Sequence, residues 1–272
     1  MPAPANRFDP DDLPADAALG EEIAASLDAD SCLLPHLPYL LQDLDDFGAR
    51  PSDVRRALTD VTLPDHRRVL DLGCGKGAVP RLLALEAQRR VLGVDAMPAF
   101  VAAARDRAAA AGVANDCRFV VGDLRAAVAR SVRGRPYGMV CLLAAVGALG
   151  DLPETVGSLR RWVEPGGLIL IDDAYCEDDA REELPDCLNR GETHAALTSH
   201  GDRIIAEVVC DGPETTAFYS DQIAKIERRA LQLAAQCPDD ADDIHAYVAR
   251  QREEIALLTG PVVGALWVLR RG

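Results

Sequence analysis

The sequence contains no segment that approaches the roughly 18 consecutive apolar residues of a membrane span. Its first residues include one early arginine, no apolar core and many Asp and Pro residues, so we expect no secretory signal. None of the 8 cysteines belongs to a Cys-x-x-Cys pair, so neither a zinc site nor a dithiol redox motif is indicated. No run of Lys or Arg offsets the formal net charge of −15, which disfavours nucleic acid and anionic membrane surfaces as partners. These absences together favour a reduced, cytoplasmic protein.

The 272 residues are enough for one large domain or for a domain with a cap, and the 49% hydrophobic content provides a core. Residues 1–19 are rich in Pro, Ala and Asp, and we expect a disordered tail there. Residues 20–64 are expected to form an N-terminal helical cap. Its helices are predicted at 21–27, at 35–47 and after an N-cap at Ser52.

One stretch organises the rest of the chain. Residues 69–72 read as a short buried strand, and a helix is predicted over 78–88. Between them lie three glycines at alternate positions, Gly73, Gly75 and Gly77. A strand that runs through a glycine turn into a helix is typical of the nucleotide-binding corner of a doubly wound α/β sheet.

Asp71 indicates which ligand this corner takes. A pyrophosphate-binding corner should not carry a carboxylate at the strand end, whereas a ligand with an ammonium or sulfonium group is attracted to one. The glycine spacing also differs from the Gly-x-Gly-x-x-Gly pattern of dinucleotide binders. The stretch resembles motif I of the class I S-adenosylmethionine-dependent methyltransferases, and the resemblance extends motif by motif over about 69–175.

This resemblance implies an α/β fold with a doubly wound, seven-stranded, mostly parallel sheet. Residues 65–210 and 262–272 would form this Rossmann-like domain, and 211–261 a helical insertion before the last strand. Strands are predicted at 69–72, 90–94, 118–121, 138–143, 168–171, 203–210 and 262–269. Helices are predicted at 98–111, 124–131, 153–163, 193–200, 215–237 and 242–258.

The implied function is transfer of a methyl group from S-adenosylmethionine to a small-molecule acceptor by in-line displacement. Two alternatives stay open. One is a non-catalytic regulator that binds S-adenosylmethionine or S-adenosylhomocysteine, and the other, less favoured, is a nicotinamide-dependent oxidoreductase. The long insertion before the last strand favours an enzyme, because it suggests a lid or substrate cap.

Three acids at strand ends are expected to bind the cofactor. Asp95 lies about 20 residues after the glycines, which suits the ribose hydroxyls, although it could equally complement the dipole of the following helix. Asp123 matches the adenine-recognition position of the family, or alternatively caps a helix. The full expected contact set is Asp71, Gly73, Cys74, Gly75, Asp95, Ala96, Met97, Asp123, Leu124, Leu142, Leu143 and Tyr39.

No catalytic base is assigned with certainty from the sequence. The candidates are Asp172, Asp173, Tyr175, His194 and His200. The adjacent Asp172 and Asp173 could also hold a divalent metal, but no acid follows strand 138–143 to complete such a site, so we expect none. The Asn/Asp-Pro-Pro-Tyr motif that holds a planar amine is absent after that strand, which weakens the case for methylating a base or an amide. One helix face carries Tyr247, Gln251 and Glu254 and meets either the pocket or solvent.

Overall fold

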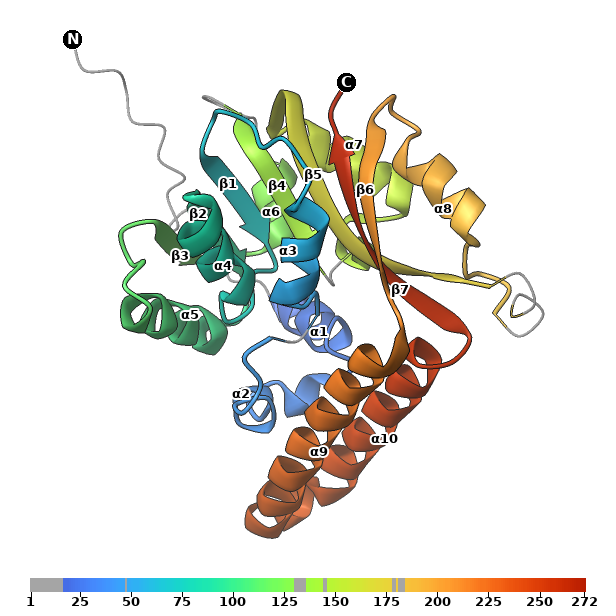
Figure 1. Cartoon of the computed structure of the whole chain (residues 1–272). Coiled ribbons are helices and arrows are strands. Elements are labelled where there is room, and N and C mark those ends of the chain that lie inside the picture. Colours follow the sequence, from blue (N-terminus) through green and yellow to red (C-terminus); the bar gives the residue numbers. More distant parts are fainter. Residues whose placement is uncertain (1–16, 47, 130–135, 144–145, 178–179, 181–183) are drawn as a thin grey trace.

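The computed structural model describes residues 17–46, 48–129, 136–143, 146–177, 180 and 184–272. Its centre is a seven-stranded sheet in the order β3-β2-β1-β4-β5-β7-β6 (Figure 1). The first five strands are parallel, and β7 runs antiparallel to both of its neighbours. This confirms the expected fold class. The strands are β1 (Arg68–Leu72), β2 (Arg90–Asp95), β3 (Cys117–Val121), β4 (Tyr137–Leu143), β5 (Val163–Cys176), β6 (Arg203–Cys210) and β7 (Val262–Arg270).

Helices cover both faces of the sheet, with α3, α4 and α5 on one face and α6, α7 and α8 on the other (Figure 1). The described helices are α1 (Ala17–Ala25), α2 (Leu37–Leu40), α3 (Pro51–Leu58), α4 (Ala78–Ala87), α5 (Pro98–Ala110), α6 (Leu124–Ala129), α7 (Leu152–Arg160), α8 (Arg190–Leu197), α9 (Gly212–Gln236) and α10 (Ala241–Leu258). Short 3-10 turns lie at η2 (Ser31–Leu33), η3 (Val146–Leu149) and η5 (Pro238–Asp240).

Successive side chains of each strand point to opposite faces of the sheet, and this divides the core into two layers. In β1, Val69 packs beneath α3 and α4, whereas Leu70 and Leu72 pack beneath α6 and α7. Every residue of β4 is buried, as expected of a central parallel strand covered on both faces. Burial of each such side chain stabilises the fold by about 1.5–3 kcal/mol.

A separate core joins the N-terminal helices to the α9–α10 hairpin, beside the carboxyl ends of the parallel strands (Figure 1). It is formed by Leu33, Leu37, Leu40 and Leu41 from the N-terminal segment and by Ile226, Leu233, Ile244 and Tyr247 from the hairpin. The cap and the insertion therefore form one covering over that edge of the sheet.

Several predicted helix boundaries were wrong. The helix expected over 35–47 is only the four residues of α2, and position 47 lies outside the described residues. The N-cap of α3 is Arg50 rather than Ser52, because Pro51 takes the first helical position, where its missing N–H costs nothing. The N-terminal tail was expected to run to residue 19, but α1 begins at Ala17; residues 1–16 lie outside the description.

Two elements extend beyond their predicted limits for identifiable reasons. The strand expected at 168–171 is the 14-residue β5, which pairs with β7 as far as Cys176. The helix expected from 193 begins at Arg190, because Asn189 and Glu192 form a capping box. The predicted helix over 124–131 is described as α6 up to Ala129.

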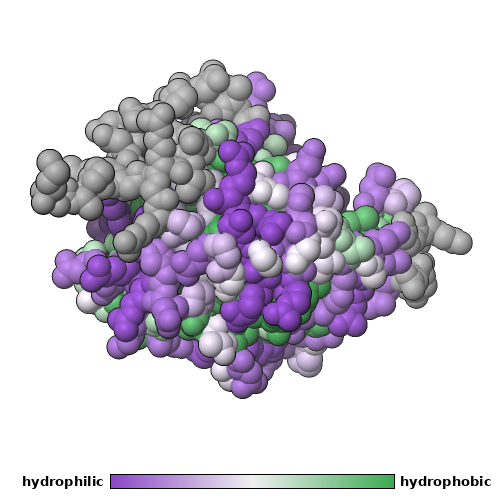
Figure 2. Space-filling model, turned by 90° about the horizontal axis from the view of Figure 1, so that it is seen from above, coloured by the Kyte–Doolittle hydropathy of each residue, from purple (hydrophilic) through white to green (hydrophobic). Residues whose placement is uncertain are grey.

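The end of the molecule opposite the cap is mostly hydrophilic, with apolar side chains scattered between polar ones (Figure 2). Among the described helices, none combines the length and apolar character needed to cross a bilayer.

Candidate functional site

The turn after β1 is built from left-handed backbone. Gly73, Gly75 and Gly77 have φ values of 71°, 49° and 73°, a region that residues with a side chain rarely adopt. At Gly77 a Cβ atom would also lie 2.8 Å from Cζ of Phe119. The glycines are therefore required both by the turn and by the packing of the turn against β3.

Asp71 is a buried carboxylate that faces this turn. It is 2% exposed and lines a narrow pocket of about 160 Å³ beside the glycines. Its side chain accepts no hydrogen bond and forms no ion pair within the described part of the chain. Burial raises its pKa to about 8, and the charge of Asp95 adds to the rise. Such a group is stabilised by a positively charged ligand.

Asp95 ties the glycine turn to the next helix. Its Oδ2 accepts a hydrogen bond from the backbone N–H of Gly75 at 2.7 Å, and its Oδ1 accepts one from Met97 at 2.9 Å. Burial raises its pKa to about 6, against the lowering effect of these two hydrogen bonds. The carboxylate therefore supports the start of α5 and lines the pocket at the same time.

Asp123 has the helix-capping contact that was one of the two alternatives, and its adenine contact stays a prediction. Its Oδ1 accepts a hydrogen bond from the backbone N–H of Arg125 at 2.8 Å at the start of α6, and it lines the narrow pocket. The pocket brings together most of the expected contact residues, namely Asp71, Gly73, Cys74, Gly75, Asp95, Ala96, Met97, Asp123, Leu124 and Leu143.

Two expected residues lie away from the pocket. Leu142 points to the opposite face of the sheet from Leu143, since neighbouring side chains in a strand alternate, and it is fully buried in the core beneath α6 and α7. Tyr39 donates its hydroxyl to Oε1 of Gln232 on α9 at 3.0 Å and lines neither cavity. Tyr39, expected to contact the cofactor, thus makes a contact between cap and hairpin instead.

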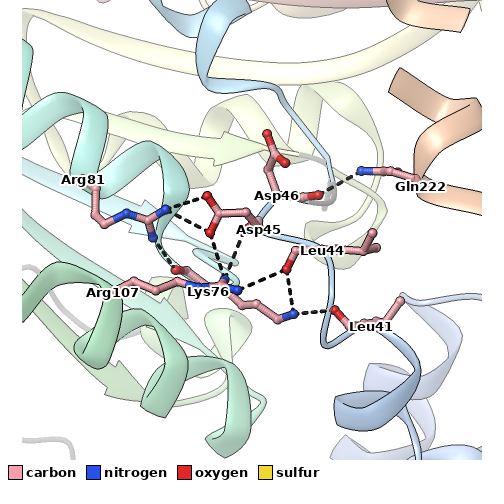
Figure 3. A network of polar contacts seen from close by, with 8 residues as sticks. All are labelled: Leu41, Leu44, Asp45, Asp46, Lys76, Arg81, Arg107 and Gln222. Carbon is pink, nitrogen blue, oxygen red and sulfur yellow. Dashed lines mark hydrogen bonds and ion pairs between the residues drawn. The ribbon is translucent and has the colours of Figure 1, made fainter. Parts of the chain in front are cut away.

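Lys76, which lies inside the glycine stretch, makes a contact that the sequence did not suggest. Its Nζ donates hydrogen bonds to the backbone carbonyls of Leu41 at 2.5 Å and Leu44 at 2.8 Å (Figure 3). Lys76 is 5% exposed, and burial, followed by the charge of Arg107, lowers its pKa to about 8. Because these carbonyls are turned toward Lys76, the chain after α2 forms turns instead of a longer helix.

Polar side chains from other elements hold the segment 41–46 from several sides (Figure 3). Arg81 forms an ion pair with Asp45 at 2.8 Å, and Arg107 reaches the same carboxylate at 3.0 Å. Asp45 and Asp46 both line the narrow pocket. This segment is therefore a lid fastened to the glycine turn and to the two helices that follow it.

A larger cavity of about 680 Å³ adjoins the narrow pocket. It lies between the cap, the α9–α10 hairpin and the end of β5, and the residues that line both are Ser26, Leu27, Ala49, Arg125 and Ala148. Asp172 and Asp173 line this cavity. Burial and the charge of Asp173 raise the pKa of Asp172 to about 8.

The other three base candidates lie elsewhere. Tyr175 is buried in the core against Trp267, with ring centroids 6.4 Å apart. Nε2 of His194 is 3.2 Å from a carboxylate oxygen of Glu207 on β6. His200 is exposed, and its Nε2 contacts the carbonyl of Pro153 at 2.9 Å. None of the three lines either cavity.

The hairpin supplies further residues to the large cavity. The shared face of Tyr247, Gln251 and Glu254 meets the cavity, which decides between the two alternatives left open by the sequence. Sequence reasoning missed Arg50, Asp53, Phe218 and Tyr219, which also line it. Phe218 and Tyr219 are adjacent aromatic residues at the start of the insertion, and this was the one sequence signal that could have pointed to them.

Residues 69–167 match the model of a family described as a methyltransferase domain. This segment resembles a methyltransferase domain, and the sheet that contains it has the class I methyltransferase fold. The matched range begins in β1 and ends in β5, so it contains the glycine turn and all three strand-end acids of the narrow pocket.

A curated relative resembles part of the chain. A trans-aconitate 2-methyltransferase from Variovorax paradoxus is 30% identical over 147 residues, which is 54% of this chain and 51% of the relative. The chain thus matches about half the length of that relative.

Solved structures share the fold over most of the chain. A methyltransferase from Geobacter sulfurreducens, in complex with S-adenosylhomocysteine, has a TM-score of 0.70 and 23% identity over 87% of this chain and 97% of its own. A methyltransferase from Thiobacillus denitrificans, in complex with the same compound, has a TM-score of 0.71 and 19% identity. The match covers 87% of this chain and 98% of that one.

Proposed function

We propose that this protein transfers the methyl group of S-adenosylmethionine to a small-molecule acceptor by in-line displacement. The observation that carries the proposal is Asp71, a buried carboxylate without a partner in the described structure, beside three left-handed glycines. A cation that approaches this turn gains the attraction of Asp71 and close contact with the backbone at once.

The residues of the narrow pocket suit the separate parts of this cofactor. Asp71 would attract its positively charged end, and Asp95 would accept hydrogen bonds from the ribose hydroxyls. Asp123 would accept one from the exocyclic amine of adenine. Apolar contacts with the ring would come from Met97 and Leu124, which line the same pocket.

When bound, S-adenosylmethionine supplies a methyl group on a positively charged sulfur, and the sulfur leaves neutral. The protein therefore needs no acid for the leaving group. Its part is to orient the acceptor and exclude water. The lid over 41–46 would exclude water, while Asp172 and Asp173 line the adjoining cavity at a position suited to receiving a proton from an acceptor.

The alternatives have less support. A non-catalytic regulator needs no second cavity, yet one of about 680 Å³ adjoins the narrow pocket. A nicotinamide cofactor would bring its pyrophosphate toward Asp71, and like charges repel. Trans-aconitate, named for the Variovorax relative, is a carboxylate and would meet Asp172 and Asp173 here.

The test is calorimetric titration with S-adenosylmethionine and S-adenosylhomocysteine. Both are expected to bind, and Asp95→Ala should weaken binding by about 1.5–3 kcal/mol through the loss of charge-assisted hydrogen bonds. Asp106→Ala on the exposed side of α5 is the matched control and should bind normally. Unchanged affinity in Asp95→Ala would remove the ribose assignment, and failure of the unaltered protein to bind either compound would remove the proposed function.

A second measurement separates an enzyme from a regulator. S-Adenosylmethionine labelled in its methyl group is incubated with the protein and a panel of small amines, phenols, thiols and carboxylates. Label is expected to appear in an acceptor. Binding of the compound with no transfer to any member of the panel would favour the regulator.

A further inference from the structure

The large cavity is lined by more negative than positive groups. Its described acidic residues are Asp28, Asp53, Asp172, Asp173 and Glu254, and its described basic residues are Arg50 and Arg125. This excess lies in the compartment that adjoins the proposed cofactor pocket, so it bears on which acceptor can enter.

The two arginines are engaged with acids of their own. Arg50 binds the 3%-exposed Asp53 through two hydrogen bonds, from Nε at 2.5 Å and from Nη2 at 3.2 Å. Arg125 lies at the boundary with the narrow pocket, where its Nε is 3.7 Å from Oδ1 of Asp123. The acidic side chains of the cavity that no arginine binds are therefore Asp28, Asp172, Asp173 and Glu254.

Three polar side chains line the cavity without a hydrogen-bond partner among the described residues. They are the carboxylate of Asp172 and the hydroxyls of Tyr219 and Tyr247. Tyr247 is only 1% exposed, so water reaches it only through the cavity. Buried polar groups are normally paired, so the unpaired hydroxyl of Tyr247, together with the half-buried Asp172 and Tyr219 beside the same cavity, indicates a polar ligand.

The acids are too dispersed for a metal ion. Within the described residues, the cluster of potential ligand atoms that lie within 4.8 Å of one another is His36, Cys237 and Asp240, at the tip of the hairpin and outside the cavity. Asp172 and Asp173 belong to no such cluster in the described chain. An organic cation, which spreads its contacts over a larger surface, fits this arrangement better than a metal does.

The cavity also offers apolar surface for the body of such a molecule. Phe218 and Tyr219 meet edge to face with ring centroids 5.4 Å apart, and both line the cavity with Ile226 and Leu258. Phe218 already has the guanidinium of Arg50 over its ring at 5.6 Å. Tyr219 and Tyr247 are therefore the rings available to an incoming cation.

We propose that the methyl acceptor is a small amine with an apolar body, which enters the large cavity as its protonated cation with the charged group against Asp172 and Asp173. The ammonium gives one proton to Asp172, the freed nitrogen lone pair forms a bond to the methyl carbon, and the carbon–sulfur bond breaks to leave neutral S-adenosylhomocysteine. This inference rests on the proposed function and names its class of acceptor. The raised pKa of Asp172 agrees with it, since burial together with Asp173 and Asp53 makes the ionised form costly until a positive charge arrives.

The test uses three probes of similar size and different charge: 2-phenylethylammonium, 2-phenylethanol and phenylacetate. Each is titrated calorimetrically into protein saturated with S-adenosylhomocysteine and, separately, into ligand-free protein at pH 7.5. The ammonium is expected to bind at least about tenfold more tightly than the alcohol, because opposite charges attract strongly in a partly dry cavity, and phenylacetate should not bind measurably.

Matched variants locate the effect. Asp172→Asn and Glu254→Gln should each reduce the affinity for the ammonium while leaving the alcohol unchanged, with the larger loss, about tenfold, at Asp172. Asp60→Asn and Glu253→Gln replace exposed acids outside the cavity and should change nothing. Retained binding of S-adenosylhomocysteine shows that each variant is folded.

The proposal is overturned if the ammonium does not bind, if the alcohol or phenylacetate binds as tightly, or if Asp172→Asn binds all three probes as the parent does. Each of these results leaves the proposed function standing as long as S-adenosylhomocysteine still binds. Failure of S-adenosylhomocysteine to bind removes the proposed function, while the series on ligand-free protein still decides whether the cavity selects cations.

Discussion

Gln222 on α9 donates a hydrogen bond from Nε2 to the backbone carbonyl of Asp46 at 2.8 Å (Figure 3). Asp46 lines the narrow pocket and Gln222 lines the large cavity. This bond, together with the ion pairs of Asp43 with Arg228 and Arg229, connects the lid over the proposed cofactor pocket with the hairpin over the proposed acceptor cavity. Movement of either covering is expected to affect the other.

Gln222→Ala should loosen the lid without altering the pocket itself. We expect dissociation of S-adenosylhomocysteine to accelerate about fivefold, which corresponds to one hydrogen bond of about 1 kcal/mol. Stopped-flow displacement measures this rate. Gln236→Ala, on an exposed position of the same helix, is the control. Equal dissociation rates in the two variants would show that the bond from Gln222 does not hold the lid.

Lys76→Met should release the lid from the glycine turn. The methionine keeps most of the apolar stem but cannot donate to the carbonyls of Leu41 and Leu44, and each lost bond to a charged group is worth about 1.5–3 kcal/mol. We expect at least tenfold weaker binding of S-adenosylhomocysteine and faster amide exchange over 41–46. The control is Arg55→Met, which removes an exposed ion pair with Glu86. Unchanged exchange would contradict the proposed role of Lys76.

Gly77→Ala and Gly112→Ala separate backbone strain from packing. Both glycines have a similar φ, 73° at Gly77 and 75° at Gly112. A Cβ atom added at Gly77 would lie 2.8 Å from Phe119, whereas a Cβ atom added at Gly112 would meet nothing within 4 Å. Gly112→Ala should cost about 1 kcal/mol of unfolding free energy, from backbone strain alone. Gly77→Ala should cost clearly more and abolish cofactor binding. Equal losses in urea unfolding would contradict the packing argument.

Asp71 should make the ligand-free protein less stable as the pH rises. Its pKa is about 8 in the folded state and 3.8 ordinarily, so the folded state holds the proton more tightly. The resulting stabilisation is fully present below pH 3.8 and is lost as the pH rises to 8. Asp172, whose pKa is also raised to about 8, should likewise make the protein less stable as the pH rises.

The measurement is thermal unfolding of ligand-free protein at pH 5, 6.5 and 8. Asp71→Asn should show a smaller decrease in Tm over this range than the parent, and it should bind S-adenosylmethionine weakly at every pH. In the parent, binding should strengthen with pH as Asp71 ionises. A decrease in Tm that is the same in both proteins would show that Asp71 is not the responsible group.

The parts of the fold that could be read from the sequence are those set by local patterns. The glycine turn and the acids at the ends of β1 and β2 follow from neighbouring residues, and the structure collects them in one pocket. Their contact with a cofactor stays a prediction. The bounds of the α9–α10 hairpin were also close, because amphipathic periodicity and Pro238 are local signals.

Contacts between distant segments could not be predicted in this way. The helix expected over 35–47 stops early because Lys76, far along the chain, binds the carbonyls of Leu41 and Leu44. Tyr175, His194 and His200 have suitable chemistry, but tertiary packing directs them to Trp267, Glu207 and Pro153. Residue type alone does not reveal which side of a strand or helix faces a cavity.

The α9–α10 hairpin leaves the sheet at the end of β6 and returns at the start of β7, and Cys210 and Gly264 are paired neighbours in these adjacent antiparallel strands. Its two ends are therefore already side by side, and its length has little influence on how the strands align. An engineer can exchange this excursion for a hairpin from another protein of the same architecture. Such an exchange would replace Tyr219 and Tyr247 on one side of the large cavity and keep Asp172 and Asp173 on β5 with the host.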